Sequence, residues 1–198
     1  IGSELCRQLI SCKPEVLILY DHSELALYTI LKEMHELSGD IRVVPVLGSV
    51  CDRSLIDQVL SENEIDVVLH AAAYKHLPLV EANEIAGLKN NVFGTKTMAD
   101  AARAAGVDRF ILVSSDKAVR PTNVMGASKR LAELVVLTEV QQRRLAVLGA
   151  LQRRGDRRAP GQQVAADERA RGADAAVEQD RAEHGLDEVG ADALAVAL

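Results

Sequence analysis

SSDKAVRPTNVMGASKR, residues 114–130, places hydroxyl, carboxylate and ammonium groups between a predicted strand and a predicted helix. The strand is residues 109–113, the most strand-like run of the chain. Asp116 and Lys117 therefore follow the carboxyl end of a strand, which is where an open α/β sheet binds its ligands. The stretch predicts a functional site on a parallel sheet.

A helix is expected to begin near residue 124. Pro121 fixes φ ahead of it, and the side chain of Asn123 can cap its first turn. On this helix Met125 and Lys129 lie one turn apart on the same face. Methionine cannot accept or release a proton, so of this pair only the lysine can take part in proton transfer.

The stretch resembles the catalytic segment of the bacterial nucleotide-sugar 4,6-dehydratases of capsule and polysaccharide biosynthesis. These enzymes act on UDP-N-acetylglucosamine and belong to the extended short-chain dehydrogenase/reductase superfamily. The resemblance rests on SDKA, on RPTNVMGASK and, upstream, on YKHLPLVE and NNVFGT in the family's order. It covers residues 1 to about 138. The large, membrane-anchored members of the family have Met, as this chain has at Met125, where the smaller soluble members have Tyr.

The resemblance implies catalytic roles for five residues, which are Ser115, Asp116, Lys117, Met125 and Lys129. Asp116 would protonate the departing hydroxyl, and Lys117 would remove the proton from the carbon beside a transient ketone. Ser115, with Lys129 nearby, would handle the sugar hydroxyl that Met125 cannot deprotonate. The alternative is that Asp116 and Lys117 form an ordinary solvated turn and that Lys129 is a charge on the helix surface.

The composition excludes several classes of function. The 198 residues carry a net charge of −6 without a basic block, which argues against binding to nucleic acid. No run approaches the eighteen or more apolar residues of a membrane span, so we expect no membrane contact by this part of the protein, although full-length relatives are often anchored. Cys6, Cys12 and Cys51 have no CxxC spacing, which indicates reduced thiols in the cytoplasm and no metal site.

Strand and helix patterns alternate along the first part of the chain. Strands are predicted near residues 16–20, 41–47, 65–70 and 109–113, with helices between them. The last of these helices is expected to be a long one over residues 84–105 that ends at Gly106. This order predicts the α/β class, with a Rossmann-like, doubly wound parallel sheet over residues 1–138. We expect the sheet to be truncated and to lack its first strand, because the Gly-rich turn of such a domain follows a strand.

A nicotinamide cofactor, NAD or NADP, is expected at the first helix. The resemblance implies that Gly2, followed by Ser3, is the last glycine of the turn that meets the pyrophosphate. Asp21 lies nineteen residues after Gly2 and would accept the ribose hydroxyls; the alternative is that it merely ends a strand. The loop around His22 and Ser23, which selects between NAD and NADP, has no arginine, so the sequence does not decide between the two cofactors.

Further cofactor contacts follow from the resemblance. Asp52 would lie near the adenine amine, although it would serve equally well as a helix cap. The small residues Ala71, Ala72 and Ala73 would admit the cofactor backbone, and the alternative is tight helix packing. The remaining contacts are expected at Lys75, Asn91 and Lys129, whereas His76 is interpreted as a packing or surface residue.

Residues 139–198 differ in kind from the rest of the chain. They use only Gln, Arg, Leu, Ala, Val, Gly, Asp, Pro, Glu and His, the ten amino acids whose codons can begin with G or C. We interpret this tail as a frameshift product of a GC-rich gene; an intact reading frame through codon 139 would contradict that. The alternative is a genuine Ala/Arg-rich extension. The tail is expected to be mobile or to form at most loosely docked helices.

The expected activity is therefore a 4,6-dehydratase that acts on a UDP-linked N-acetylhexosamine, in a protein that is a homo-oligomer when intact. One alternative is an NAD-dependent nucleotide-sugar epimerase or dehydrogenase, which uses the same sheet but needs a Tyr where this chain has Met125. Another is an inactive cofactor-binding remnant, because the lobe that grips the sugar is expected to be missing after residue 138.

Overall fold

The computed structural model describes residues 1–155 and 193–197 of the chain. The chain divides into two compact units: one joins Ile1–Glu139 with Ala191–Leu198, and the other is Val140–Gly190. The candidate site lies in the first unit, which contains the sheet.

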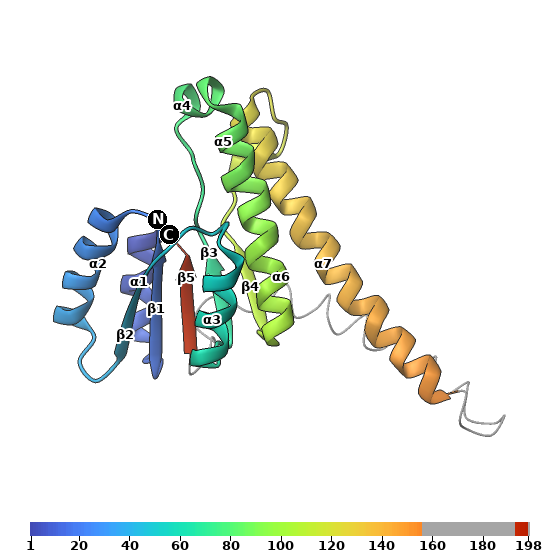
Figure 1. The fold of residues 1–198 in the computed structure, drawn as a ribbon, viewed down its shortest axis with the longest axis horizontal. Coiled ribbons are helices and arrows are strands. Elements are labelled where there is room, and N and C mark those ends of the chain that lie inside the picture. Colours follow the sequence, from blue (N-terminus) through green and yellow to red (C-terminus); the bar gives the residue numbers. More distant parts are fainter. Residues whose placement is uncertain (156–192, 198) are drawn as a thin grey trace. The chain divides into compact units, whose positions relative to one another are not determined.

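Five strands form one parallel sheet, shown in Figure 1. They are β1 (Val16–Asp21), β2 (Arg42–Leu47), β3 (Val67–His70), β4 (Arg109–Leu112) and β5 (Ala193–Ala197). The first four confirm the predicted strands to within two residues at each end. The apolar runs are fully buried in β1 and β3, as expected for a parallel sheet that is covered on both faces.

The helices lie between the strands in the predicted order. They are α1 (Gly2–Ser11), α2 (Glu24–Leu37), α3 (Arg53–Asn63), α4 (Leu77–Ala82), α5 (Glu84–Leu88), α6 (Thr95–Ala105) and α7 (Val124–Gly155). A π-helix, Lys89–Gly94, joins α5 to α6, so the single long helix expected over residues 84–105 is interrupted. Gly106 ends α6 with φ of 80°, as its sequence position predicts.

The order of strands across the sheet is β2-β1-β5-β3-β4. If β5 is counted as the first strand, this is the 3-2-1-4-5 order of the doubly wound dinucleotide-binding fold, which confirms the predicted fold class. The α3 and α6 helices cover one face of the sheet, and α1 lies behind the other (Figure 1). Because all neighbours are parallel, their carboxyl ends meet at one edge.

The expectation that the tail is mobile or forms at most loosely docked helices is wrong for residues 193–197, which form a strand of the sheet. This segment lies between β1 and β3, with Ala195 opposite both Ile18 and Val68, so the place of the first strand is filled. The physical reason is that the facing edges of β1 and β3 carry buried peptide groups that need partners. A short apolar segment can supply them whatever its origin. The remaining tail residues, 156–192 and 198, lie outside the described part of the chain.

Candidate functional site at the carboxyl edge of the sheet

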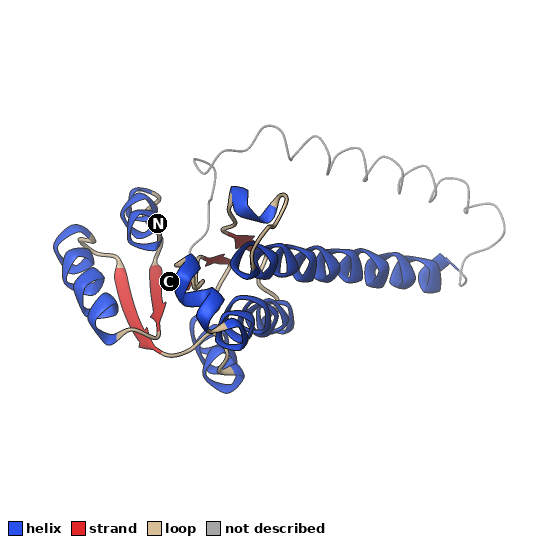
Figure 2. Cartoon of the chain, turned by 90° about the horizontal axis from the view of Figure 1, so that it is seen from above, coloured by secondary structure: helices blue, strands red, loops and turns tan. Residues whose placement is uncertain are grey.

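The end of β1 and the start of α1 meet at the carboxyl edge. Figures 1 and 2 place the N-terminus of α1 beside the carboxyl end of β5. Gly2 and Ser3 thus lie where a glycine turn would follow a first strand, and no side chain among the described residues caps this helix end. Its N–H groups are suited to an anion.

Asp21 ends β1 at the same edge and is only 7% exposed. Its Oδ1 accepts a hydrogen bond of 2.8 Å from the backbone N–H of Ser23 and lies 3.5 Å from Nδ1 of His22. The hydroxyl of Ser23 in turn accepts from Ala26 and caps α2. The local hydrogen bonds therefore hold the Asp21 carboxylate in a fixed direction.

Asp52 caps α3, which is the alternative that the sequence left open for this residue. Its Oδ1 accepts a 3.1 Å hydrogen bond from the N–H of Leu55. A contact of Asp52 with adenine stays a prediction.

Asn91 connects the loop after β3 to α7. Its side chain is 1% exposed; Oδ1 accepts from the N–H of Tyr74 at 2.7 Å, and Nδ2 donates to the carbonyl of Tyr74 at 3.0 Å and to Oγ of Ser128 at 2.9 Å. Asn91 lies in the π-helix, a local irregularity that often occurs at functional sites. Its amide is fully used within the protein, so it positions the site rather than offering a free donor to a ligand.

The loop that Asn91 holds contains the other predicted cofactor residues. Ala72 is buried, and Ala71 and Ala73 are partly exposed. Lys75 is exposed and lines a cavity of about 270 Å³, whose other lining residues are Tyr74, His76, Leu79, Val80, Asn83, Ala86 and Gly87. The structure thus places Lys75 at a cavity formed with α4 and α5.

Two residues fix the start of α7, which begins at Val124 as predicted. Oδ1 of Asn123 accepts from the N–H of Gly126 at 2.7 Å, so Asn123 is the cap that its position predicts. Oε1 of Glu81, from α4, accepts from the N–H of Val124 at 2.8 Å. The first turn of α7 is therefore tied both to its own loop and to α4.

The Asp116–Lys117 turn packs against this first turn of α7. Residues 116–118 form a single 3₁₀ turn, and Oγ of Ser115 and Oδ1 of Asp116 accept from the N–H of Lys117 at 3.1 and 3.0 Å. A Cβ atom added to Gly126 would lie 2.5 Å from the carbonyl oxygen of Lys117. Glycine at position 126 is thus what allows the two segments to approach each other closely.

The predicted catalytic side chains divide into exposed and buried groups. Asp116 and Lys117 are exposed, whereas Met125 is 2% and Lys129 7% exposed. Nζ of Lys129 donates to the carbonyl of Val113 at 2.6 Å, directly beyond β4. Burial lowers the pKa of Lys129, and the carboxylate of Glu133 acts in the opposite direction. Lys129 is therefore no surface charge, contrary to the alternative weighed for it.

Glu133 and Ser114 also belong to this region, although the sequence analysis did not assign them a role. Oγ of Ser114 donates to Oε1 of Glu133 at 2.5 Å, and Arg130 donates to Oε2 at 2.8 Å. The hydrogen bond from Ser114 is the main cause that lowers the pKa of Glu133. The sequence does contain a signal for this pair: Glu133 lies one helical turn after Lys129, and Ser114 directly follows a predicted strand.

His70, at the end of β3, is the third residue to which the sequence analysis assigned no role. It is fully buried, and its Nε2 lies 2.9 Å from Oγ1 of Thr95. The Thr95 hydroxyl donates to the carbonyl of Asn91, so it accepts from His70, which assigns the proton to Nε2. Burial lowers the pKa of His70 to about 3, with the charge of Lys129 acting in the same direction. The sequence signal for His70 is its place as a polar residue at the end of an apolar strand, VVLH.

Neither a metal cluster nor a membrane helix is found in the described residues. No group of three or more His, Cys, Asp or Glu side chains within residues 1–155 and 193–197 is arranged to hold a metal ion. Over the same residues, no helix combines the length and apolar character that a membrane crossing requires.

Comparison with known proteins agrees with this arrangement of strands. The profile of the family described as "Polysaccharide biosynthesis protein" matches residues 1–148. The chain belongs to this family. Among its relatives, the capsular polysaccharide biosynthesis protein CapD of Staphylococcus aureus is 44% identical over 137 residues, which are 69% of this chain and 23% of that protein.

A second relative has a named enzymatic activity. The UDP-N-acetylglucosamine 4,6-dehydratase (inverting) of Campylobacter jejuni is 33% identical over 117 residues, 59% of this chain and 33% of the relative. A solved structure, the dTDP-glucose 4,6-dehydratase DesIV of Streptomyces venezuelae with NAD bound, superimposes with a TM-score of 0.58 at 25% identity, covering 68% of this chain and 46% of that one. The chain thus spans less than half the length of each of these proteins.

The contact between Gly126 and the Lys117 turn leads to a first prediction. Gly126→Ala should lower the free energy of unfolding by about 1–3 kcal/mol, because the added methyl group meets backbone that must move. Urea denaturation followed by circular dichroism measures the loss. Gly87→Ala is the control, since its methyl group meets only the side chain of Val80. An equal or greater loss for Gly87→Ala would contradict this account.

His70 predicts how stability depends on pH. The unfolded chain protonates this imidazole below about pH 6.5, whereas the folded chain does so only near pH 3, so stability falls as the pH falls between these values. The difference in the protonation of His70 between the two states should lower the free energy of unfolding by about 3 kcal/mol at pH 4. His70→Gln should make the fall between pH 6.5 and 4 shallower by about this amount in urea titrations, whereas His76→Gln, at an exposed site, should not change it. If the free energy of unfolding fell equally with pH in the unchanged chain and both variants, His70 would not be the group responsible.

Proposed function

We propose that this domain belongs to a nucleotide-sugar 4,6-dehydratase that acts on UDP-N-acetylglucosamine-type substrates in polysaccharide biosynthesis. The observation that carries the proposal is the contact of the Asp116–Lys117 turn with the start of α7, the helix that buries Met125 and Lys129. This contact brings a carboxylic acid and an amine to the edge of the sheet where ligands of this fold bind. The relatives named above support a role in capsular polysaccharide synthesis and sugar dehydration.

The residues at the carboxyl edge fit a nicotinamide cofactor, NAD or NADP. The uncapped N-terminus of α1 suits the pyrophosphate, and the fixed carboxylate of Asp21 suits a ribose hydroxyl. Lys129 of α7, whose Nζ reaches the carbonyl of Val113 just beyond β4, would contact the second ribose, and the segment 71–73 would line the cofactor. When bound, the cofactor supplies an acceptor and later a donor for hydride.

Asp116 and Lys117 would then carry out the elimination. Asp116 would donate a proton to the departing hydroxyl, and Lys117 would accept the proton from the neighbouring carbon. A closed cleft favours the neutral forms of a carboxylic acid and an amine, and in the described residues both side chains are exposed. Closure of the site by a substrate lobe is therefore part of the proposal.

The alternative of an epimerase is less well supported, because Met125 stands at the position that needs a proton-transferring phenol. We propose that residues 1–198 are inactive on their own, because they span only 23–33% of the two relatives named above. The cytoplasmic location, the homo-oligomeric state and the frameshift origin of residues 139–198 stay predictions.

Cofactor binding can be measured on the chain itself. NAD at a hundred times its dissociation constant should stabilise the fold by about 2.7 kcal/mol, which is read as a rise in the thermal midpoint. Asp21→Ala should abolish the rise, whereas Glu24→Ala, at the exposed start of α2, should preserve it. A chain that neither NAD nor NADP stabilises would favour the inactive remnant without cofactor binding.

The base can be tested in a chain extended with the first strand and substrate lobe of a relative. Lys117→Ala should abolish the incorporation of solvent deuterium into the sugar, because it removes the proposed base, while cofactor binding stays nearly intact. Mass spectrometry of the product measures the exchange. Met125→Tyr should retain far more activity, and Lys32→Ala, on the exposed face of α2, serves as the control. Near-normal turnover of Lys117→Ala would show that another residue is the base.

A further inference from the structure

The space between β1 and β3 is a slot that one strand fills. On one side Val16 to Tyr20 pair with Ala193–Ala197, and on the other Val67 to His70 pair with Leu194 to Ala197. No direct pairing joins β1 to β3. Without an occupant, the peptide groups of two strands at the centre of the sheet would lose their hydrogen bonds.

The walls of the slot define the chemistry of its occupant. Leu17, Ile18 and Leu19 of β1 are completely buried, and β3 is buried along its whole length. The occupant must therefore be extended and apolar, and it must have an N–H at every pairing position, which excludes proline. At its amino end, the N–H of Ala193 donates to Oδ2 of Asp66 at 3.0 Å, which helps to fix the parallel direction.

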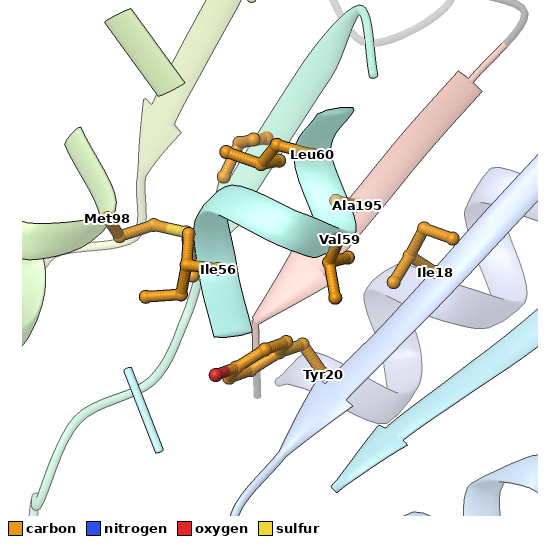
Figure 3. A pocket seen from close by; sticks show the side chains of 8 residues that line it. Ile18, Tyr20, Ile56, Val59, Leu60, Met98 and Ala195 are labelled. Atoms are coloured by element: carbon orange, nitrogen blue, oxygen red, sulfur yellow. The ribbon is translucent and has the colours of Figure 1, made fainter. Parts of the chain in front are cut away.

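The present occupant is smaller than the slot allows. An apolar cavity lies beside Ala195. The centre of a water-sized sphere can occupy about 10 Å³ of it, which is about the smallest volume that holds a group of that size. Figure 3 shows Ala195 beside the side chains that line the cavity. These side chains come from β1, α3, β3 and α6. They are Ile18, Tyr20, Ile56, Val59, Leu60, Val68 and Met98. A larger side chain at this position would extend into the cavity.

We propose that the slot between β1 and β3 is a binding site for an extended apolar peptide that enters parallel to both strands. The site prefers a β-branched residue at the position of Ala195, and Ala193–Ala197 is an exchangeable occupant. Recognition is by backbone hydrogen bonds on both sides, which any sequence without proline can supply, and by the apolar walls, which select small or branched residues. This goes beyond the proposed enzymatic function and does not depend on it.

The test uses the full chain and a fluorescent peptide that copies residues 192–198 with valine in place of Ala195. The Ala195→Asp variant should bind this peptide at least about tenfold more tightly than the unchanged chain, because a buried carboxylate expels the chain's own strand, which otherwise competes. Fluorescence anisotropy after long incubation measures the affinities. The same peptide with proline at that position should bind neither chain.

Each other outcome also bears on the proposal. If Ala195→Asp is unfolded, the peptide should restore its circular dichroism; a variant that the peptide neither binds nor refolds overturns the proposal, as does equal affinity for both chains. The Ala195→Val variant tests separately whether the cavity beside residue 195 accepts a larger side chain. Its thermal midpoint should rise by about 2–4 °C, and its Ala195–Ala197 amides should exchange more slowly with deuterium. A fall in the midpoint would show that the cavity cannot accept the larger side chain.

Discussion

The structure depends on the continuity of hydrogen bonding across the centre of its sheet. A parallel sheet that is buried on both faces has no water to satisfy its peptide groups, so every interior strand needs a neighbour on each side. β5 supplies that neighbour to β1 and β3. With the sheet continuous, the carboxyl ends of all five strands lie along one edge, and the polar residues that follow them are brought together there.

The site is held by a second set of contacts, which work through glycine and buried amides instead of through charged pairs. Gly126 lets the carbonyl of Lys117 approach α7, and Asn91 joins Tyr74 to Ser128 of the same helix. The helix that carries Lys129 is thereby fixed against the loops after both β3 and β4. The exposed Asp116 and Lys117 side chains project from this rigid base, which is what a site needs if a substrate lobe is to close over it.

Much of this arrangement could be predicted from the sequence, because each signal was local. Apolar runs gave β1 to β4, Pro121 and Asn123 marked the start of α7, and Gly106 marked the end of α6. β5 could not be predicted, since ALAVA is an ordinary apolar segment whose strand conformation depends on a slot formed by residues more than a hundred positions away. The burial of Lys129 and the hydrogen bonds of His70 and Asn91 could not be predicted, because they arise from packing between elements.

The position of β5 changes how the order of the chain relates to its fold. The carboxyl end of β5 lies beside the N-terminal end of α1, as Figure 1 shows. A strand that leads into a helix is the usual opening of a doubly wound domain, and here that pair is completed by the two opposite ends of one polypeptide. In the unit that contains the sheet, the last strand along the sequence and the first helix thus take the positions of the strand and the helix that open such a domain.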